Sequence, residues 1–150
     1  MPVVVFCGTP SLIHFVWFPS FDLIQNSCVL QPIHIMDERD IKDYHAHIYY
    51  EPETRAAAAR VRAGLAANFC VQLGRWHDEP VGPHPKAMYQ AVFPPTEFGK
   101  IVPWLMLNRE GLTLLVHPST GDSLGDHLDR ALWLGAILTL RTGVLRRGES

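Results

Sequence analysis

The chain has 150 residues, of which 19% are charged, and its 13 Lys and Arg nearly balance its 15 Asp and Glu. This length suits one compact domain that buries a sizeable apolar core. A formal net charge of −2, without a cluster of basic side chains, argues against both a nucleic-acid-binding protein and a protein of the membrane surface.

The first 35 residues are apolar, but they follow neither a helical nor a strand period, and three prolines interrupt them. They lack the basic segment and the cleavage site of a signal peptide, and the prolines break any membrane-spanning helix. Residues 1–35 therefore form an atypical N-terminal arm, and residues 36–150 form the domain. Two interpretations stay open: the arm packs on the domain, or translation begins at Met36, where the chain turns polar.

Regular patterns begin at Asp43. Polar and histidine side chains alternate with apolar ones over 43–50, which predicts a strand with His45 and His47 on one face. Pro52 and an alanine- and arginine-rich run then predict a helix that ends near Asn68. Its expected buried stripe consists of Ala58, Val61 and Leu65.

The rest of the chain gives two more strands, a helix, a fourth strand and a last helix. "FCVQLGRW" and "AMYQAVF" are strands, separated by a proline-rich loop that carries His84. Thr96 is expected to cap a helix that extends to Asn108, with a late start or a kink at Pro103. "LTLLVHP" predicts a strand with His117 near its end, "STGDSLGD" a turn, and "HLDRALWLGAIL" a third helix.

The order β-α-β-β-α-β-α predicts an α+β fold of the ferredoxin-like sandwich type. In that topology the first and fourth strands are neighbours, and both crossover helices cover one face of the sheet. The other face is left for the last helix, a partner or a ligand to cover. His45, His47 and His117 should point to that second face, and Leu115 should be exposed there unless something covers it.

Histidines two apart on a strand have Cα atoms roughly 6.5–7 Å apart, and their rings can converge on one ion with bonds of about 2.1 Å. The spacing alone is also common on exposed strands that bind nothing. His84, between two prolines, can equally be an ordinary loop residue, and His127 an ordinary helix N-terminal residue. Spacing therefore marks a candidate metal site and does not prove one.

The segments "DYHAHIYY", "PVGPHP", "VPWLMLNREGLTLLVHPSTGD" and "DHLDRALWLG", in this order, resemble the DOPA 4,5-dioxygenase family of fungi and bacteria. The resemblance runs from Asp43 to Gly135 and leaves the arm outside. It implies a dimeric α/β barrel of ferredoxin-like type. It also implies extradiol cleavage of a catechol such as L-DOPA by dioxygen, with non-haem Fe(II) as the cofactor.

For such chemistry we expect His45, His47 and His117 as ligands of Fe(II), with Zn(II) as an ion that purified protein can carry instead. No carboxylate ligand is evident, so either the site is all-histidine or one of the three lies outside the ligand set. His84, and after it His127, are the candidate acid/base catalysts. Arg109 is expected to pair with a substrate carboxylate or to interact with its helix end, and Tyr89 to contact the substrate ring or to lie in the core.

A second class of function keeps the same fold as a non-catalytic dimer that binds a metal or a small ligand. The three cysteines, Cys7, Cys28 and Cys70, include no C-x-x-C pair and favour a reducing compartment. We therefore expect a cytoplasmic homodimer whose partners are a catechol and dioxygen, with no nucleic acid and no membrane.

Overall fold

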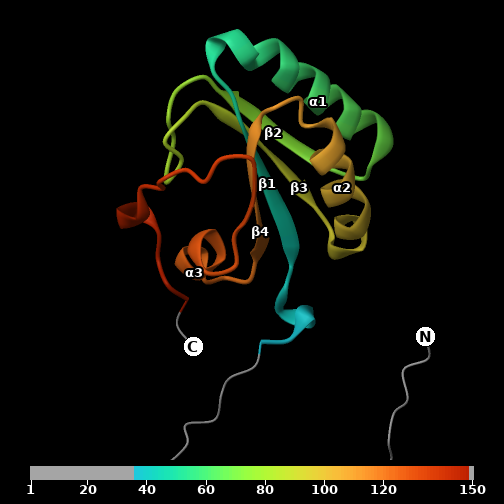
Figure 1. Ribbon diagram of the computed structural model, residues 1–150. Helices are drawn as coiled ribbons and strands as arrows, with labels where there is room; N and C mark the ends of the chain where they lie inside the picture. Colours follow the sequence, from blue (N-terminus) through green and yellow to red (C-terminus); the bar gives the residue numbers. More distant parts are fainter. Residues whose placement is uncertain (1–35, 149–150) are drawn as a thin grey trace, which may run out of the picture. The chain divides into compact units, whose positions relative to one another are not determined.

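The computed structural model describes residues 36–148, so the predictions about the arm, residues 1–35, lie outside the described residues. Figure 1 shows an α+β arrangement of helices and strands. Short 3-10 turns lie at Glu38–Asp40, Pro52–Thr54 and Thr142–Val144. The helices and strands are β1 (Asp43–Tyr49), α1 (Arg55–Asn68), β2 (Gln72–His77), β3 (Met88–Phe93), α2 (Pro95–Asn108), β4 (Thr113–Ser119), α3 (Ser123–Leu128) and β5 (Leu132–Leu134).

The five strands form one open antiparallel sheet in the order β2-β3-β1-β4-β5. The first and fourth strands are neighbours, as expected, with Ala46 opposite Val116. The predicted α+β class is therefore confirmed. The fifth strand, at the free edge of β4, is an element that the sequence did not predict.

Both long helices cover one face of the sheet, which we call the helix face (Figure 1). The apolar positions of β1 point to it, and Ala46 and Ile48 have no exposed surface there. The buried stripe of α1 is the predicted one: Ala58, Val61 and Leu65. From α2, Ile101, Val102 and Leu105 complete this core.

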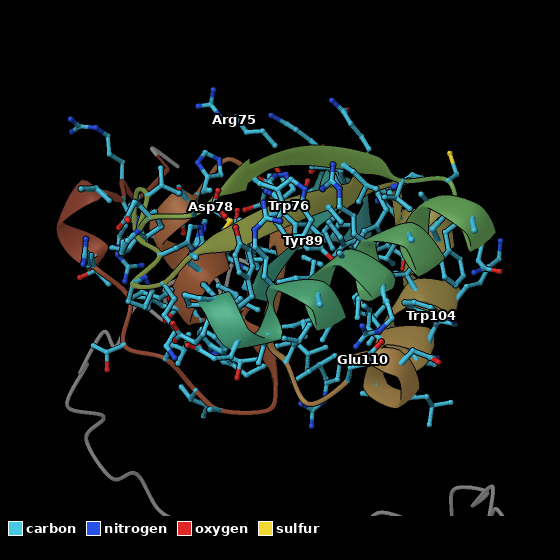
Figure 2. The ribbon with its side chains drawn as sticks, turned by 90° about the horizontal axis from the view of Figure 1, so that it is seen from above. Arg75, Trp76, Asp78, Tyr89, Trp104 and Glu110 are labelled. Carbon is cyan, nitrogen blue, oxygen red and sulfur yellow. The ribbon has the colours of Figure 1, made fainter. Side chains whose placement is uncertain are left out.

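The second helix differs from the prediction at its start. It begins at Pro95 with Pro94 as the N-cap, so Thr96 lies inside the helix and does not cap it. It also continues through Pro103 to Asn108. In Figure 2 the Trp104 side chain of this helix lies beside α1, where Gly64 leaves room for the indole. None of the helices in residues 36–148 is long and apolar enough to cross a membrane.

The prediction of a helix from His127 to Leu138 is wrong. Helix α3 begins at Ser123, inside the segment expected to be a turn, and ends at Leu128. Residues 132–134 then pair with Leu114, Leu115 and Val116 as β5. The free edge of β4 needs partners for its backbone N–H and C=O groups, and this demand overrides the helical spacing of the apolar residues.

The second face of the sheet, which carries His45, His47 and His117, we call the histidine face. Leu115 lies there without exposed surface, because Trp133, Leu138 and Leu140 of the same chain pack around it with Tyr49 and Met88. Of the covers that the sequence left open for Leu115, residues of the same chain supply this one. The segment after β5, with Leu138 and Leu140, therefore covers the part of the histidine face around Leu115.

Candidate metal centre

Three histidines meet on the histidine face as the sequence predicts. His45 lies directly opposite His117 in the pairing of β1 with β4, and His47 is two residues further along β1. The pleat points all three rings to the same side. Their ligand nitrogens lie within 4.8 Å of one another, so these side chains can reach one ion.

Two further histidines join this cluster from outside the sheet. His84 comes from the loop between β2 and β3, and His127 comes from α3. The ring centroids of His47 and His84 are 4.0 Å apart, as are those of His117 and His127. His47, His84 and His127 thus form a second group whose ligand nitrogens lie within 4.8 Å of one another. The two candidate acid/base residues therefore lie beside the three candidate ligands.

The cluster is withdrawn from water. His47, His84 and His117 expose 3%, 4% and 3% of their surfaces. Burial disfavours the charged imidazolium and lowers the pKa of His84 to about 4 and that of His117 to about 3, with further lowering by neighbouring histidines. The pKa values of His47 and His127 are lowered for the same first reason. At neutral pH these four rings are neutral, the form in which imidazole binds metals.

Backbone carbonyls fix the proton positions on two of these rings. His117 Nδ1 lies 2.7 Å from the Pro118 carbonyl oxygen, and His127 Nδ1 lies 2.8 Å from that of Ser123. A carbonyl oxygen only accepts, so both Nδ1 atoms must donate and carry the proton. The assignment rests on the hydrogen-bond partners and leaves a lone pair on the Nε2 atom of each ring, which in His117 faces His47 Nε2 at 3.1 Å.

His47 has the features of a ligand more than those of a structural residue. Its Nε2 atom lies 3.1 Å from His117 Nε2, and its buried Nδ1 atom has no hydrogen-bond partner among the described residues. A buried unpaired polar atom costs stability and is typical of functional positions. Two nitrogens bound to one ion at about 2.1 Å lie roughly 3.0–3.4 Å apart, which fits the observed separation.

His45 lies at the rim of the cluster. Its Nε2 atom is 3.0 Å from Asp43 Oδ1, an ion-pair distance, although this buried oxygen has no hydrogen-bond partner among the described residues. The grouped candidate ligands within residues 36–148 are all histidines. The carboxylates of Glu51 and Asp122 bind Lys86 and Gly125 instead. The donor set therefore favours the all-histidine alternative.

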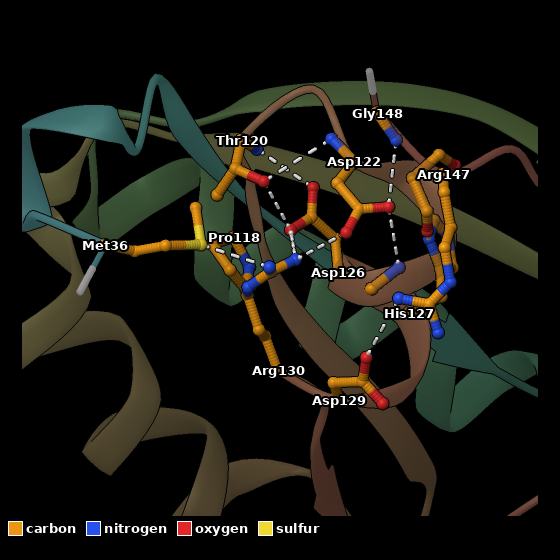
Figure 3. Close-up of polar contacts among 12 residues, drawn as sticks. Met36, Pro118, Thr120, Asp122, Asp126, His127, Asp129, Arg130, Arg147 and Gly148 are labelled. Carbon is orange, nitrogen blue, oxygen red and sulfur yellow. Dashed lines mark hydrogen bonds and ion pairs between the residues drawn. The ribbon is translucent and has the colours of Figure 1, made fainter. Parts of the chain in front are cut away.

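A buried carboxylate that the sequence analysis missed anchors the helix of His127. Asp126 exposes 3% of its surface and accepts hydrogen bonds from Thr120 N and Oγ1 and from Arg130 Nη1. Asp122 also contacts Arg130, at 3.3 Å (Figure 3). This network ties α3 to the end of β4, and it holds His127 next to His117. Its signal in the sequence was the pair of aspartates four residues apart around Gly125.

An open cavity of about 500 Å³ borders the cluster at His127. It is lined by Leu128 of α3, by Trp133 of β5 and by residues after β5 that include Ile137 and Leu140. The Trp133 ring also stacks on Tyr49 with centroids 6.0 Å apart. The sequence analysis treated residues 127–138 as one helix and therefore did not predict this cavity. Apolar and aromatic walls beside a few polar groups are typical of small-molecule sites.

The two predicted substrate-binding residues lie elsewhere. Tyr89 is fully buried on the helix face, where its hydroxyl donates to the Ala58 carbonyl, so the structure does not bring it to the histidines (Figure 2). Arg109 ends α2, and its Nη1 atom donates to the Leu112 carbonyl at 2.7 Å. Thr113, the residue after Leu112, is about 13 Å along β4 from His117. The sequence analysis left open a core position for Tyr89 and a helix-end interaction for Arg109, and these are the positions that the structure shows.

Three comparisons relate the chain to known proteins. The model of the Dopa 4,5-dioxygenase family matches residues 44–144. A DOPA 4,5-dioxygenase of Amanita muscaria is 35% identical over 113 residues, which are 69% of this chain and 49% of that protein. An uncharacterised 21.2 kDa protein of Botryotinia fuckeliana is 41% identical over 85 residues, or 51% of this chain and 46% of that one.

A solved structure is also similar. A candidate dioxygenase from Nostoc punctiforme shares 59% sequence identity and superposes with a TM-score of 0.70, covering 71% of this chain and 92% of that one. By contrast, the chain spans about half the length of the two curated relatives. The matched region contains all five clustered histidines.

Proposed function

Because the chain belongs to the Dopa 4,5-dioxygenase family, we propose that it is an extradiol ring-cleaving dioxygenase that opens a catechol such as L-DOPA with the help of non-haem Fe(II). The observation that carries the proposal is the cluster of five histidines, three of them buried, next to an aromatic-lined cavity. The substrate, the iron and the position of cleavage are proposals for this chain.

We assign the ion to His45, His47 and His117. The proposal is supported by their ligand nitrogens within 4.8 Å, by the lone pair on His117 Nε2 and by the 3.1 Å between the Nε2 atoms of His47 and His117. When bound, Fe(II) would supply the redox chemistry and the open coordination positions that ring cleavage by dioxygen requires. Zn(II) fits the same donors and would supply no oxygen chemistry.

We place the catechol ring in the cavity lined by His127 and Trp133. Its volume of about 500 Å³ lies in the range of small-molecule sites, and the indole offers a flat surface for an aromatic ring. Leu128 and Leu140 add apolar walls that exclude water from the ring. His127 borders both the cavity and the cluster, which would bring the catechol oxygens to the histidines.

His127 is the candidate base in this arrangement. Its Nδ1 proton is held by the Ser123 carbonyl, so the Nε2 lone pair is free to accept a proton from a catechol hydroxyl. The overall reaction breaks one carbon–carbon bond of the ring and places both atoms of dioxygen in the product. It therefore needs no external reductant.

We further propose that the fold is ferredoxin-like and that the protein is a cytoplasmic homodimer. The order β2-β3-β1-β4 supports the topology. Leu128, Ile137 and Val144 are exposed apolar side chains, and Ile137 exposes 79% of its surface, which supports a partner surface near the cavity. Sedimentation at micromolar concentration distinguishes a dimer from a monomer of 16.9 kDa.

The experiment that tests the function loads the full chain with Fe(II) without oxygen and then adds oxygen and a catechol. We expect one dioxygen consumed per catechol and a yellow product, because ring opening extends conjugation. L-DOPA and 4-methylcatechol serve as substrates, and mass spectrometry of the products gives the position of cleavage. The Zn(II)-loaded protein and the His117→Ala variant are the controls, and both should be inactive.

Two outcomes contradict parts of the proposal. No oxygen uptake with either catechol at full Fe(II) occupancy would remove the dioxygenase and leave the non-catalytic metal-binding protein. A Trp133→Ala variant with an unchanged KM would place the substrate outside the proposed cavity. In that case the metal assignment would stand, because Trp133 is not among its residues.

A further inference from the structure

Tyr49 and His84 form a buried pair on the histidine face. Tyr49 is the last residue of β1, on the same side as His45 and His47, and it exposes 2% of its surface. Its hydroxyl oxygen lies 2.7 Å from His84 Nδ1. Within residues 36–148 this is the single hydrogen bond of the Tyr49 hydroxyl.

This pair determines where His84 carries its proton. A buried hydroxyl hydrogen needs an acceptor, and His84 Nδ1 is the acceptor that the described residues offer. Both side chains are buried, with 2% and 4% of their surfaces exposed, a setting that favours the uncharged form of each group. A neutral imidazole that accepts at Nδ1 carries its proton on Nε2.

The contacts of His117 in β4 and His127 in α3 give the opposite result. His117 and His127 donate from Nδ1 to carbonyl oxygens and are left with Nε2 lone pairs. Among His84, His117 and His127, His84 is therefore the one whose Nε2 is an N–H group, and because its Nδ1 lone pair accepts from Tyr49, neither of its nitrogens is free for an ion. By distance alone, two groups that share His47 could each hold an ion. One adds His45 and His117, and the other adds His84 and His127.

We propose that Tyr49 is a positioning residue that withholds His84 from the metal and turns its Nε2–H toward the reacting oxygens. The role of His84 rests on the proposed function, in which that N–H group donates a hydrogen bond to an oxygen that gains negative charge during ring cleavage. Such a donor stabilises the transition state without giving up its proton. The selection of the ion's ligands by Tyr49 does not depend on the reaction.

The first test is a measurement on the unmodified chain. Nitrogen-15 NMR of the imidazole rings distinguishes a protonated Nδ1 from a protonated Nε2, and a His84→Gln variant identifies the His84 signals. We expect His84 to be protonated on Nε2 in the metal-free protein and to remain so after addition of Zn(II). His117 Nε2 should instead change its signal on Zn(II) binding. A His84 ring that is protonated on Nδ1, or that binds Zn(II), would overturn the proposal.

The second test compares two adjacent tyrosines. Tyr49→Phe removes the hydroxyl that fixes His84, whereas Tyr50→Phe removes one that bonds to the His77 carbonyl and to Asp78 away from the cluster. We expect Tyr49→Phe to give a measurable Nδ1-protonated fraction of His84 and a kcat lowered about 10- to 100-fold, with KM little changed. Tyr50→Phe should leave the His84 signals and kcat unchanged.

The outcomes separate this proposal from the proposed function. If no catechol is cleaved but His84 stays protonated on Nε2 and shifts only in Tyr49→Phe, the ligand selection stands and the reaction does not. If cleavage occurs and Tyr49→Phe changes neither the His84 signals nor kcat, the reaction stands and the positioning role of Tyr49 does not.

Discussion

The two faces of the sheet are built from alternate residues of the same strands and differ completely in chemistry. On the helix face, Ala46, Ile48 and Val116 are buried among apolar side chains of α1 and α2. On the histidine face, His45, His47 and His117 are their immediate chain neighbours, and two of the three are just as buried. Apolar burial on the first face stabilises the fold, and burial on the second keeps imidazoles neutral at a cost in stability.

This contrast predicts that substitutions can separate fold stability, which depends on the helix face, from metal affinity, which depends on the histidine face. Changes on the helix face should lower stability and leave the metal affinity of the folded protein alone. Changes on the histidine face should lower the metal affinity and leave the stability of the metal-free protein largely unchanged. Each prediction below breaks or sharpens that separation, beginning with the largest effect.

The largest effect is expected for His47→Leu. Loss of one of three ligands should weaken Zn(II) binding by at least about a hundredfold, a change that isothermal titration measures directly. The metal-free variant should be at least as stable as the original chain in urea unfolding, because leucine removes the buried Nδ1 atom that has no partner. A metal-free variant that is less stable by several kcal/mol would show that His47 is a structural residue.

Leu65→Ala, on the other face, should lower the free energy of unfolding by about 2–5 kcal/mol. The side chain is fully buried in the middle of the core between α1 and the sheet, and the neighbouring helix cannot close the space it leaves. Zn(II) affinity, measured at a temperature where the variant is folded, should be unchanged. A loss of affinity equal to that of His47→Leu would show that the two faces are coupled.

Acid should destabilise the metal-free protein through the histidine face. The pKa of His84 is lowered to about 4 and that of His117 to about 3, whereas the unfolded chain takes up these protons near pH 6.5. Between these values the unfolded state binds more protons, so stability is full above pH 6.5 and falls as the pH is lowered toward 4.

The expected loss between pH 7 and pH 4 is a few kcal/mol, seen as a falling midpoint of urea unfolding. His84→Gln should reduce this pH dependence, since glutamine takes up no proton in this range. A midpoint that is constant over the same range in the metal-free protein would mean that the histidines are not desolvated as the structure shows.

Gly64→Ala should have the smallest effect, roughly 1–3 kcal/mol, and again on the helix face alone. A Cβ atom at Gly64 would lie 2.6 Å from the Trp104 ring, so the indole between α1 and α2 must shift. Gly99→Ala in α2 is the matched control, because no atom lies within 4 Å of its added Cβ. Thermal unfolding of both variants should show a lower Tm for Gly64→Ala only.

Much of this organisation is readable from local periods. The alternation over 43–50 predicts which residues of β1 face the helices and which carry the imidazoles, because successive side chains of a strand point to opposite sides. The spacing of Ala58, Val61 and Leu65 predicts the buried stripe of α1 for the equivalent helical reason. The grouping of His45, His47 and His117 follows from these periods and from the adjacency of the first and fourth strands.

Only the tertiary structure decided the last strand, the cavity and the hydrogen bonds around the histidines. Residues 132–134 have the spacing of a helix and become a strand, because the edge of β4 offers backbone partners that no local pattern reveals. That change moves Trp133 onto Tyr49 and creates the cavity at His127. Tyr49 and Asp126 acquired their roles from contacts with His84 and Arg130, at 2.7 Å and 3.0 Å. A sequence records the residue types that can form such hydrogen bonds, and the fold determines which of them meet.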